Sequence, residues 1–270
     1  MMDLALFAPL ILVGCVAGFM AGLLGVGGGL IIVPVFVWWM NSHGLGGPYL
    51  QHVAVASSLA IMVCTSFSSV VAQQKQRSVR WDIFKKLGPA IVVGTLLGAQ
   101  AAAYIPGRQL QWFFVVFVFF VGVKTFMGRK TGGSRELPGW LGSGVVGGII
   151  GVVSSWIGIG GSTMTIPFMT WCKVPIRQAI GTSSLLGWPI AFFGAVGYML
   201  SGQGEVDLPG MVGFVYFPGV IAVAMTTVVF APLGVKVAHS ISPKLLKIIF
   251  SLLLLTVSGQ MLYSLLMHPV

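Results

Sequence analysis

Long apolar segments, with nearly all charged residues between them, constrain this chain more than any other feature. Only 7% of its 270 residues are charged and 56% are hydrophobic, whereas soluble domains contain about 25% charged residues. A membrane-spanning helix needs roughly 20 mainly apolar residues. The sequence therefore predicts an all-α polytopic membrane protein. The apolar segments run over 4–40, 52–72, 83–104, 110–128, 139–172, 179–200, 211–234 and 243–267.

The two halves of the chain carry the same motifs in the same order. Gly25–Pro34 reads GVGGGLIIVP, and Gly158–Pro167 reads GIGGSTMTIP. VASSLAIM, which begins at Val55, then matches GTSSLLGW, which begins at Gly181. We therefore predict two structural repeats within a single membrane transport domain. The repeats cover 4–128 and 139–268, the linker covers 129–138, and the domain covers 1–270.

Basic residues indicate how the repeats are oriented, because short cytoplasmic loops collect Lys and Arg. The loop after the second apolar segment holds Lys75 and Arg77, whereas its counterpart in the other repeat holds Glu205 and Asp207. Equivalent loops are therefore predicted on opposite sides of the membrane, with every basic residue except Arg108 inside. The prediction is two inverted-topology repeats, each with a broken helical hairpin followed by three transmembrane helices. The net charge of +10 is then a topology signal and an attraction to membrane lipid, not a nucleic-acid site.

The first apolar segment of each repeat is interrupted by glycines. In 139–172, the arms on either side of the break would be about 25 and 20 Å long as helices, and both are shorter than a hydrocarbon core of about 30 Å. A re-entrant hairpin fits best, although two short, tilted crossings stay open. The tips of the two hairpins, which enter from opposite faces, are predicted to meet near the midplane.

A broken helix at membrane depth suggests a binding site, because its backbone groups need partners there. A helix that restarts after glycines exposes amide donors and the positive end of its dipole, which together bind anions. Paired hydroxyls begin the next helix in each repeat and add neutral donors that suit sulfite or a sulfonate group. The alternative is that these small residues only permit close helix packing. The predicted substrate-binding residues are Gly27, Gly28, Gly29, Ser57, Ser58, Gly160, Gly161, Ser162, Thr182, Ser183 and Ser184.

Trp156 and Trp188 lie beside the second tip and the second set of hydroxyls in the sequence. We add both to the predicted binding residues, since an aromatic wall could hold the organic part of a sulfonate. Ordinary packing is the alternative explanation. All five acidic residues lie in predicted loops or at the N-terminus, which argues against a cation substrate. No C-x-x-C spacing is present, so we predict neither metal nor cofactor.

The doubled Gly-x-Gly-Gly element with its proline, each copy followed by a Ser-Ser helix, resembles the sulfite exporter TauE/SafE family, also called the toluenesulfonate uptake permease superfamily. The resemblance covers about residues 10–265. It implies movement of sulfite, sulfonates or related sulfur-containing anions across the bacterial inner membrane, with the glycines and hydroxyls near the substrate. The chain departs from the family pattern at Ser162, where a third glycine is usual, and at its two tryptophans, which favours an organic sulfonate.

The leading hypothesis is a secondary transporter for sulfite or an organosulfonate, with no enzymatic activity and no catalytic residues. An anion channel on the same scaffold is one alternative. An intramembrane serine hydrolase is another, although it would need a general base near one of the paired serines. The sequence leaves open the transport direction, the coupling ion and whether the protein forms a homodimer.

Overall fold

The computed structural model describes residues 4–45, 47–127, 137–206 and 208–267. Asp207 and most of the predicted linker, residues 129–136, lie outside the described residues. Within the described ranges the chain forms ten α-helices and one two-stranded antiparallel hairpin. The prediction of an all-α membrane protein is confirmed.

The helices of the first half begin with α1 (Leu4–Leu24) and α2 (Gly29–Ser42), which are separated by the first glycine break. They continue with α3 (Leu50–Lys75), α4 (Trp81–Ala102) and α5 (Gly107–Phe126). The second half begins with α6 (Trp140–Ile157) and α7 (Ser162–Trp171), separated by the second break. It continues with α8 (Ile176–Ser201), the strands β1 (Met211–Val212) and β2 (Val215–Tyr216), α9 (Phe217–Ser240) and α10 (Pro243–Met267).

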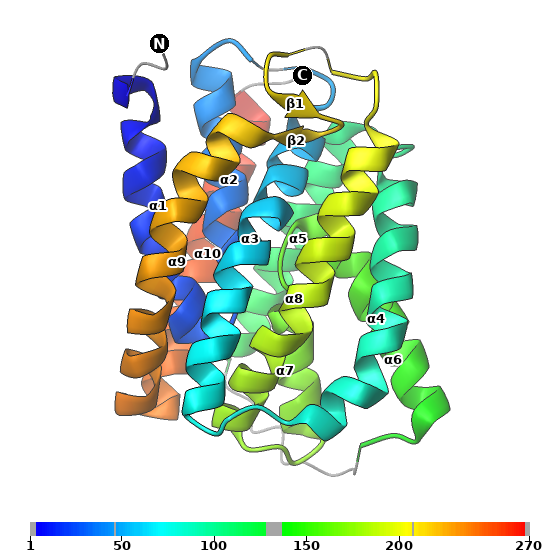
Figure 1. Cartoon of the computed structure of the whole chain (residues 1–270), viewed down its shortest axis with the longest axis vertical. Helices are drawn as coiled ribbons and strands as arrows, with labels where there is room; N and C mark the ends of the chain where they lie inside the picture. The colour runs from blue at the N-terminus through cyan, green and yellow to red at the C-terminus, as the bar shows by residue number, and fades with distance from the viewer. Residues whose placement is uncertain (1–3, 46, 128–136, 207, 268–270) are drawn as a thin grey trace.

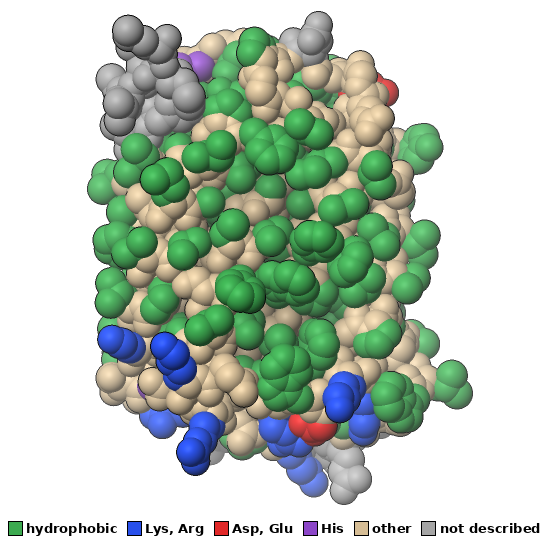
Figure 2. Space-filling view, viewed as in Figure 1, with side chains coloured by type: hydrophobic (Ala, Val, Ile, Leu, Met, Phe, Trp, Pro, Cys, Tyr) green, Lys and Arg blue, Asp and Glu red, His purple; other side chains and the backbone are tan. Residues whose placement is uncertain are grey.

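The helices form one upright bundle with α3 and α8 at its centre (Figure 1). These two helices are more buried than the other candidate spans, at 67% and 78% of their most apolar windows. Among the described residues, six helices are long and apolar enough to cross a membrane: α3, α5, α6, α8, α9 and α10. Apolar side chains cover the side of the bundle, and Lys and Arg gather at its lower end (Figure 2). This distribution is what a membrane-spanning protein requires.

Helices of the two halves pack against each other in a reciprocal pattern. Helix α1 packs against α9, and α6, its counterpart, packs against α4. The counterparts α3 and α8 contact each other, as do α5 and α10. The loop after α3 lies at the lower end of the bundle and the loop after α8 at the upper end (Figure 1). An inverted repeat would produce this arrangement, and its orientation in a membrane stays a prediction.

Glycines allow the closest of these helix pairs to form. A β-carbon on Gly22 of α1 would overlap the carbonyl oxygen of Ala231 in α9, and one on Gly234 of α9 would overlap that of Phe19 in α1. The α4–α6 pair is built in the same way, since a β-carbon on Gly94 would overlap Gly148. Small residues at such interfaces let helix backbones approach closely. Much of the glycine content therefore serves packing.

The predicted apolar segment 211–234 begins as a β-hairpin, and helix starts only at Phe217. Gly210 and Gly213 have φ of 86° and 55°, a left-handed conformation that turns the chain and that glycine adopts without strain. The hairpin also buries Phe214 completely, and the amide of Phe214 donates to the Tyr198 carbonyl of α8 at 3.3 Å. Because the left-handed Gly210 and Gly213 turn the chain, residues 211–216 form a hairpin, although their apolar pattern continues that of the following helix.

Candidate functional site

The first break reverses the chain through left-handed glycines on both sides of Val26. Gly25, Gly27 and Gly28 have φ of 69°, 76° and 91°, and Gly28 is the residue that precedes the first turn of α2. A residue with a β-carbon would be strained in this conformation. We name residues 25–29 the first tip.

The second break uses the same geometry with fewer left-handed residues. Gly158 ends α6 with φ 73°, and Gly161 precedes α7 with φ 70°. Ser162 is the first residue of α7 and is completely buried. We name residues 158–162 the second tip.

The two tips contact each other, as the sequence predicted. A β-carbon on Gly29 would overlap the Gly158 carbonyl oxygen, and one on Gly160 would lie 3.2 Å from the Val26 carbonyl oxygen. The Ser58 hydroxyl of α3 donates to the Gly158 carbonyl at 3.1 Å. A second hydroxyl, that of Ser184 in α8, lies near the first tip, 3.3 Å from the position of a β-carbon on Gly25. Each tip is thus next to a predicted hydroxyl from the other half of the chain. We name this region the junction.

Several hydrogen-bond donors at the junction have no partner in the part of the chain that the structure describes. Among the described residues, the amides of Gly29 and Leu30 in α2 and of Ser162 and Thr163 in α7 donate to no acceptor. The Ser162 hydroxyl is buried and likewise without a partner. Buried polar groups are nearly always hydrogen-bonded, so a group of unpaired donors at two facing helix N-termini requires an explanation. Close packing accounts for the glycines but not for these donors.

Three other predicted hydroxyls bond to different elements. The Ser57 hydroxyl accepts from the Tyr216 amide at 3.0 Å, and the Ser183 hydroxyl bonds to that of Thr165 in α7 at 2.8 Å. The Thr182 hydroxyl accepts from the Arg80 amide at 3.0 Å. These bonds fix central helices to neighbouring segments. Of the predicted hydroxyl residues, Ser58, Ser162 and Ser184 are the ones with a described contact at the tips.

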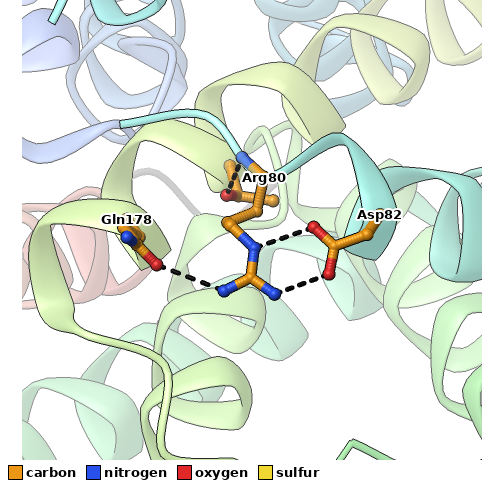
Figure 3. Close-up of polar contacts among 4 residues, drawn as sticks. Arg80, Asp82 and Gln178 are labelled. Atoms are coloured by element: carbon orange, nitrogen blue, oxygen red, sulfur yellow. Dashed lines mark hydrogen bonds and ion pairs between the residues drawn. The ribbon is translucent and has the colours of Figure 1, made fainter. Parts of the chain in front are cut away.

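The Arg80 guanidinium belongs to a polar cluster at the start of α4 (Figure 3). It donates two hydrogen bonds to the Asp82 carboxylate, at 2.8 and 2.6 Å, and one to the Gln178 side chain of α8 at 3.3 Å. The hydrogen bonds and charge of Arg80 lower the pKa of Asp82 below its ordinary value. This cluster connects the α3–α4 loop to α8 at the lower, basic end of the molecule.

The two predicted tryptophans have their described contacts away from the tips. The Trp156 indole donates to the Gly98 carbonyl of α4 at 2.8 Å and packs edge-on against Phe113 of α5. Trp188 stacks on Phe192, one turn further along α8, with ring centroids 5.7 Å apart. These contacts agree with the alternative of ordinary packing.

Met62 and Ser66 of α3 reach the junction, although the sequence analysis did not select them. The Met62 side chain is completely buried, and its Sδ lies 2.9 Å from the position of a β-carbon on Gly29. The Ser66 hydroxyl lies 3.1 Å from the corresponding position on Gly27. The only available signal was helical spacing, since Ser58, Met62 and Ser66 follow one another at intervals of one turn on the same face of α3.

The junction is closed in this structure, and the larger cavity lies elsewhere. Described residues of both tips are buried, and a crevice beside Gly28 and Val26 has no room for a water molecule. A cavity of about 410 Å³ opens at the upper end of the bundle, where α3 and α5 begin. The described hydrogen bonds of His43, His52 and His239 go to Trp39, Ala102 and Gln73.

Comparison with known proteins identifies the relatives of the chain. The family model for the sulfite exporter TauE/SafE matches residues 10–261. A "probable membrane transporter protein" of Haemophilus influenzae is 30% identical, over 93% of this chain and 96% of its own length. Proteins with the same description from Methanocaldococcus jannaschii and Bacillus subtilis are 25% and 22% identical, over 93% and 96% of this chain and 93% and 98% of their own lengths. No solved structure matches the chain.

The helical bundle, its six candidate spans and these relatives define a multi-pass membrane transporter. More specifically, the chain belongs to the sulfite exporter TauE/SafE family, since the family model covers nearly all of it. The resemblance found in the sequence is thereby confirmed. A location in the bacterial inner membrane is consistent with this membership.

Proposed function

We propose that the protein is a secondary transporter that binds sulfite or an organosulfonate anion at the junction of the two tips. The observation that carries this proposal is the buried group of unpaired donors, namely the Ser162 hydroxyl and the first amides of α2 and α7. Two helix N-termini that face one solute supply donors and positive partial charge without a charged side chain. Inverted repeats with broken helices characteristically bind their substrate at this place.

The chemistry of the donors favours an oxyanion. A buried donor without a partner costs about 1–3 kcal/mol, and an anion with several acceptor oxygens can satisfy several donors at once. A charge at a helix N-terminus contributes up to about 2 kcal/mol in a partly buried geometry. The acidic side chains that the structure describes, Asp82 and Glu205, are exposed and lie at the ends of the bundle, so none of them opposes an anion at the junction.

The closed junction supports a carrier in preference to an open pore. Met62 occupies the space between the tips, and no water-sized passage is described beside them. Access would then alternate as one repeat moves against the other. Met62 is unbranched and flexible, so its side chain can leave the junction when the tips separate.

Replacing Ser162 with alanine tests the proposal. Because the Ser162 hydroxyl has no partner among the described residues, Ser162→Ala should leave the melting temperature of the ligand-free protein unchanged or raise it. Loss of a hydrogen bond to a charged ligand should weaken sulfite binding about tenfold. We would measure sulfite-induced thermal shifts of purified protein and saturable counterflow of labelled sulfite in proteoliposomes.

Ser201→Ala is the matched control, because the Ser201 hydroxyl is also buried and unpartnered but lies at the end of α8. It should bind and transport sulfite like the unmodified protein. Equal binding by both variants would exclude the junction as the binding site. A voltage-linear current that does not saturate would reject the carrier in favour of a channel. If neither sulfite nor any sulfonate stabilises the protein, the substrate assignment is wrong.

A further inference from the structure

The cavity at the upper end of the bundle is lined by residues that belong to neither tip. Its walls are residues 47–52 before and within the first turn of α3, residues 103–108 at the start of α5, Gln111, and Leu265 of α10. Its volume of about 410 Å³ falls within the range of about 300–1,000 Å³ that is usual for small-molecule sites. The proposed transport site does not use any of these residues.

Two polar side chains in the wall are buried and incompletely paired. Gln51 is 3% exposed, and neither its amide nitrogen nor its amide oxygen has a partner among the residues that the structure describes. His52 is completely buried; its Nε2 donates to the Ala102 carbonyl at 3.0 Å, and its Nδ1 has no partner. Burying an unpaired amide is unfavourable, and native proteins seldom do so without a ligand, an ion or a water molecule. Gln51 lines the cavity, so rotation of its side chain would bring the unpaired amide to a partner there.

The charges around the cavity indicate the sign of that partner. The N-terminal ends of α3 and α5 both lie at it, with Leu50 and Gly107 in the wall, and each contributes positive partial charge. Arg108 is also in the wall, and it is the basic residue that the charge distribution predicts outside. The Tyr49 hydroxyl is already engaged, because it donates to the Glu205 carboxylate at 2.6 Å. Glu205 itself does not line the cavity.

We propose that this cavity is a second binding site for a small oxyanion, held by the Gln51 amide, Arg108 and the two helix N-termini. The choice of sulfur oxyanions as ligands rests on the proposed transport function, in which the cavity would collect or release the anion on the outer side. A lipid phosphate group has the same chemistry and is the other possible source of the oxyanion.

Sulfite and sulfate are the probes, titrated by calorimetry into the full-length protein in a phosphate-free, non-ionic detergent. Gln51→Leu should weaken the affinity of the cavity for these probes about tenfold. Because the substitution removes an unpaired buried amide, the melting temperature of the ligand-free protein should stay equal or rise. Arg108→Gln should also weaken binding and reduce its salt dependence. Arg108 is exposed, so this substitution keeps the test valid if Gln51→Leu fails to fold.

Gln109→Leu and Lys124→Gln are the controls, since both residues lie on α5 but outside the cavity wall. They should bind like the unmodified protein. The proposal is overturned if neither probe binds, or if Gln51→Leu and Arg108→Gln both bind within twofold of the unmodified protein. Ser162→Ala separates the two sites. If the junction does not bind the anion, Ser162→Ala will have no effect, while Gln51→Leu and Arg108→Gln still weaken binding. If the cavity does not bind the anion, Gln51→Leu and Arg108→Gln will have no effect, while Ser162→Ala still weakens binding.

Nanodiscs identify the source of the oxyanion. If a lipid headgroup occupies the cavity, phosphatidylglycerol should weaken the apparent affinity for sulfite in the unmodified protein but not in Arg108→Gln. If free anions occupy the cavity, the affinity for sulfite should be the same in nanodiscs that contain phosphatidylglycerol and in an uncharged detergent. Either result supports the oxyanion site.

Discussion

At the scale of single residues, glycine serves two physical purposes in this protein. At Gly25, Gly27, Gly28, Gly158 and Gly161, positive φ values require it. At Gly29 the φ is ordinary, and contact with the other tip excludes a β-carbon. The unpaired Ser162 hydroxyl follows directly after such a glycine. The proposed site therefore requires glycine for two reasons: some positions have positive φ values, and Gly29 has no space for a β-carbon.

Gly29→Ala tests the contact between the tips. In an isolated helix, alanine would be more stable than glycine by about 1 kcal/mol. Here the new β-carbon would overlap the Gly158 carbonyl, and overpacking of this kind costs about 1–3 kcal/mol. We expect a lower melting temperature in detergent. Gly148→Ala in α6 is the control, because a β-carbon there meets no atom within 4 Å, and it should be neutral or stabilising. Equal stability of the two variants would mean that the tips are apart.

At the scale of elements, polar contacts at helix ends fix the central helices. Arg80 and Asp82 form an ion pair at the start of α4, and Arg80 also contacts Gln178 and Thr182 of α8. At the upper end, Tyr49 before α3 bonds to Glu205 after α8. Both sets of contacts join a loop of one half of the chain to the other half.

The Arg80–Asp82 pair predicts how stability depends on pH. Because Arg80 lowers the pKa of Asp82 in the folded protein, the pair stabilises the fold above the ordinary Asp pKa, and this contribution is lost as the pH falls through the lowered value. The pair is exposed, so its contribution is only about 0–1 kcal/mol. We expect Asp82→Asn to lower the melting temperature slightly at pH of about 7 and to match the unmodified protein once the pH lies below the lowered pKa of Asp82.

A double-mutant cycle provides the control for this prediction. Arg80→Gln should reproduce the effect of Asp82→Asn, and the two substitutions together should cause little further loss. An Asp82→Asn difference that persists undiminished in acid would show that the effect does not depend on the charge of Asp82, and it would reject the ion pair as its cause.

At the scale of the whole molecule, reciprocal packing of the two halves places both breaks at one point. The pairs α1–α9 and α4–α6 each contain one helix from each half of the chain, and α3 and α8 contact each other at the centre. The tips can therefore meet, although their sequences are more than one hundred residues apart. The clustering of Lys and Arg at one end (Figure 2) then predicts which end faces the cytoplasm.

Cysteine labelling tests this orientation. In a background without Cys15, Cys64 and Cys172, Arg77→Cys and Glu205→Cys place single thiols in equivalent exposed loops. A membrane-impermeant maleimide should label Glu205→Cys in spheroplasts and Arg77→Cys only after permeabilisation. Labelling of both thiols from the same side would contradict the inverted repeat.

The sequence by itself determined the class of protein, the breaks at residues 25–29 and 158–162, and the family. These features follow from hydropathy, glycine spacing and repetition, which act locally along the chain. Only the tertiary structure decided that Ser58 and Ser162 lie at the junction, that Thr182 and Trp156 bond elsewhere, and that Gln51 lines a separate cavity. The reason is that a helical side chain's partner depends on which helices approach within ångströms of each other, and that is a property of the assembled bundle.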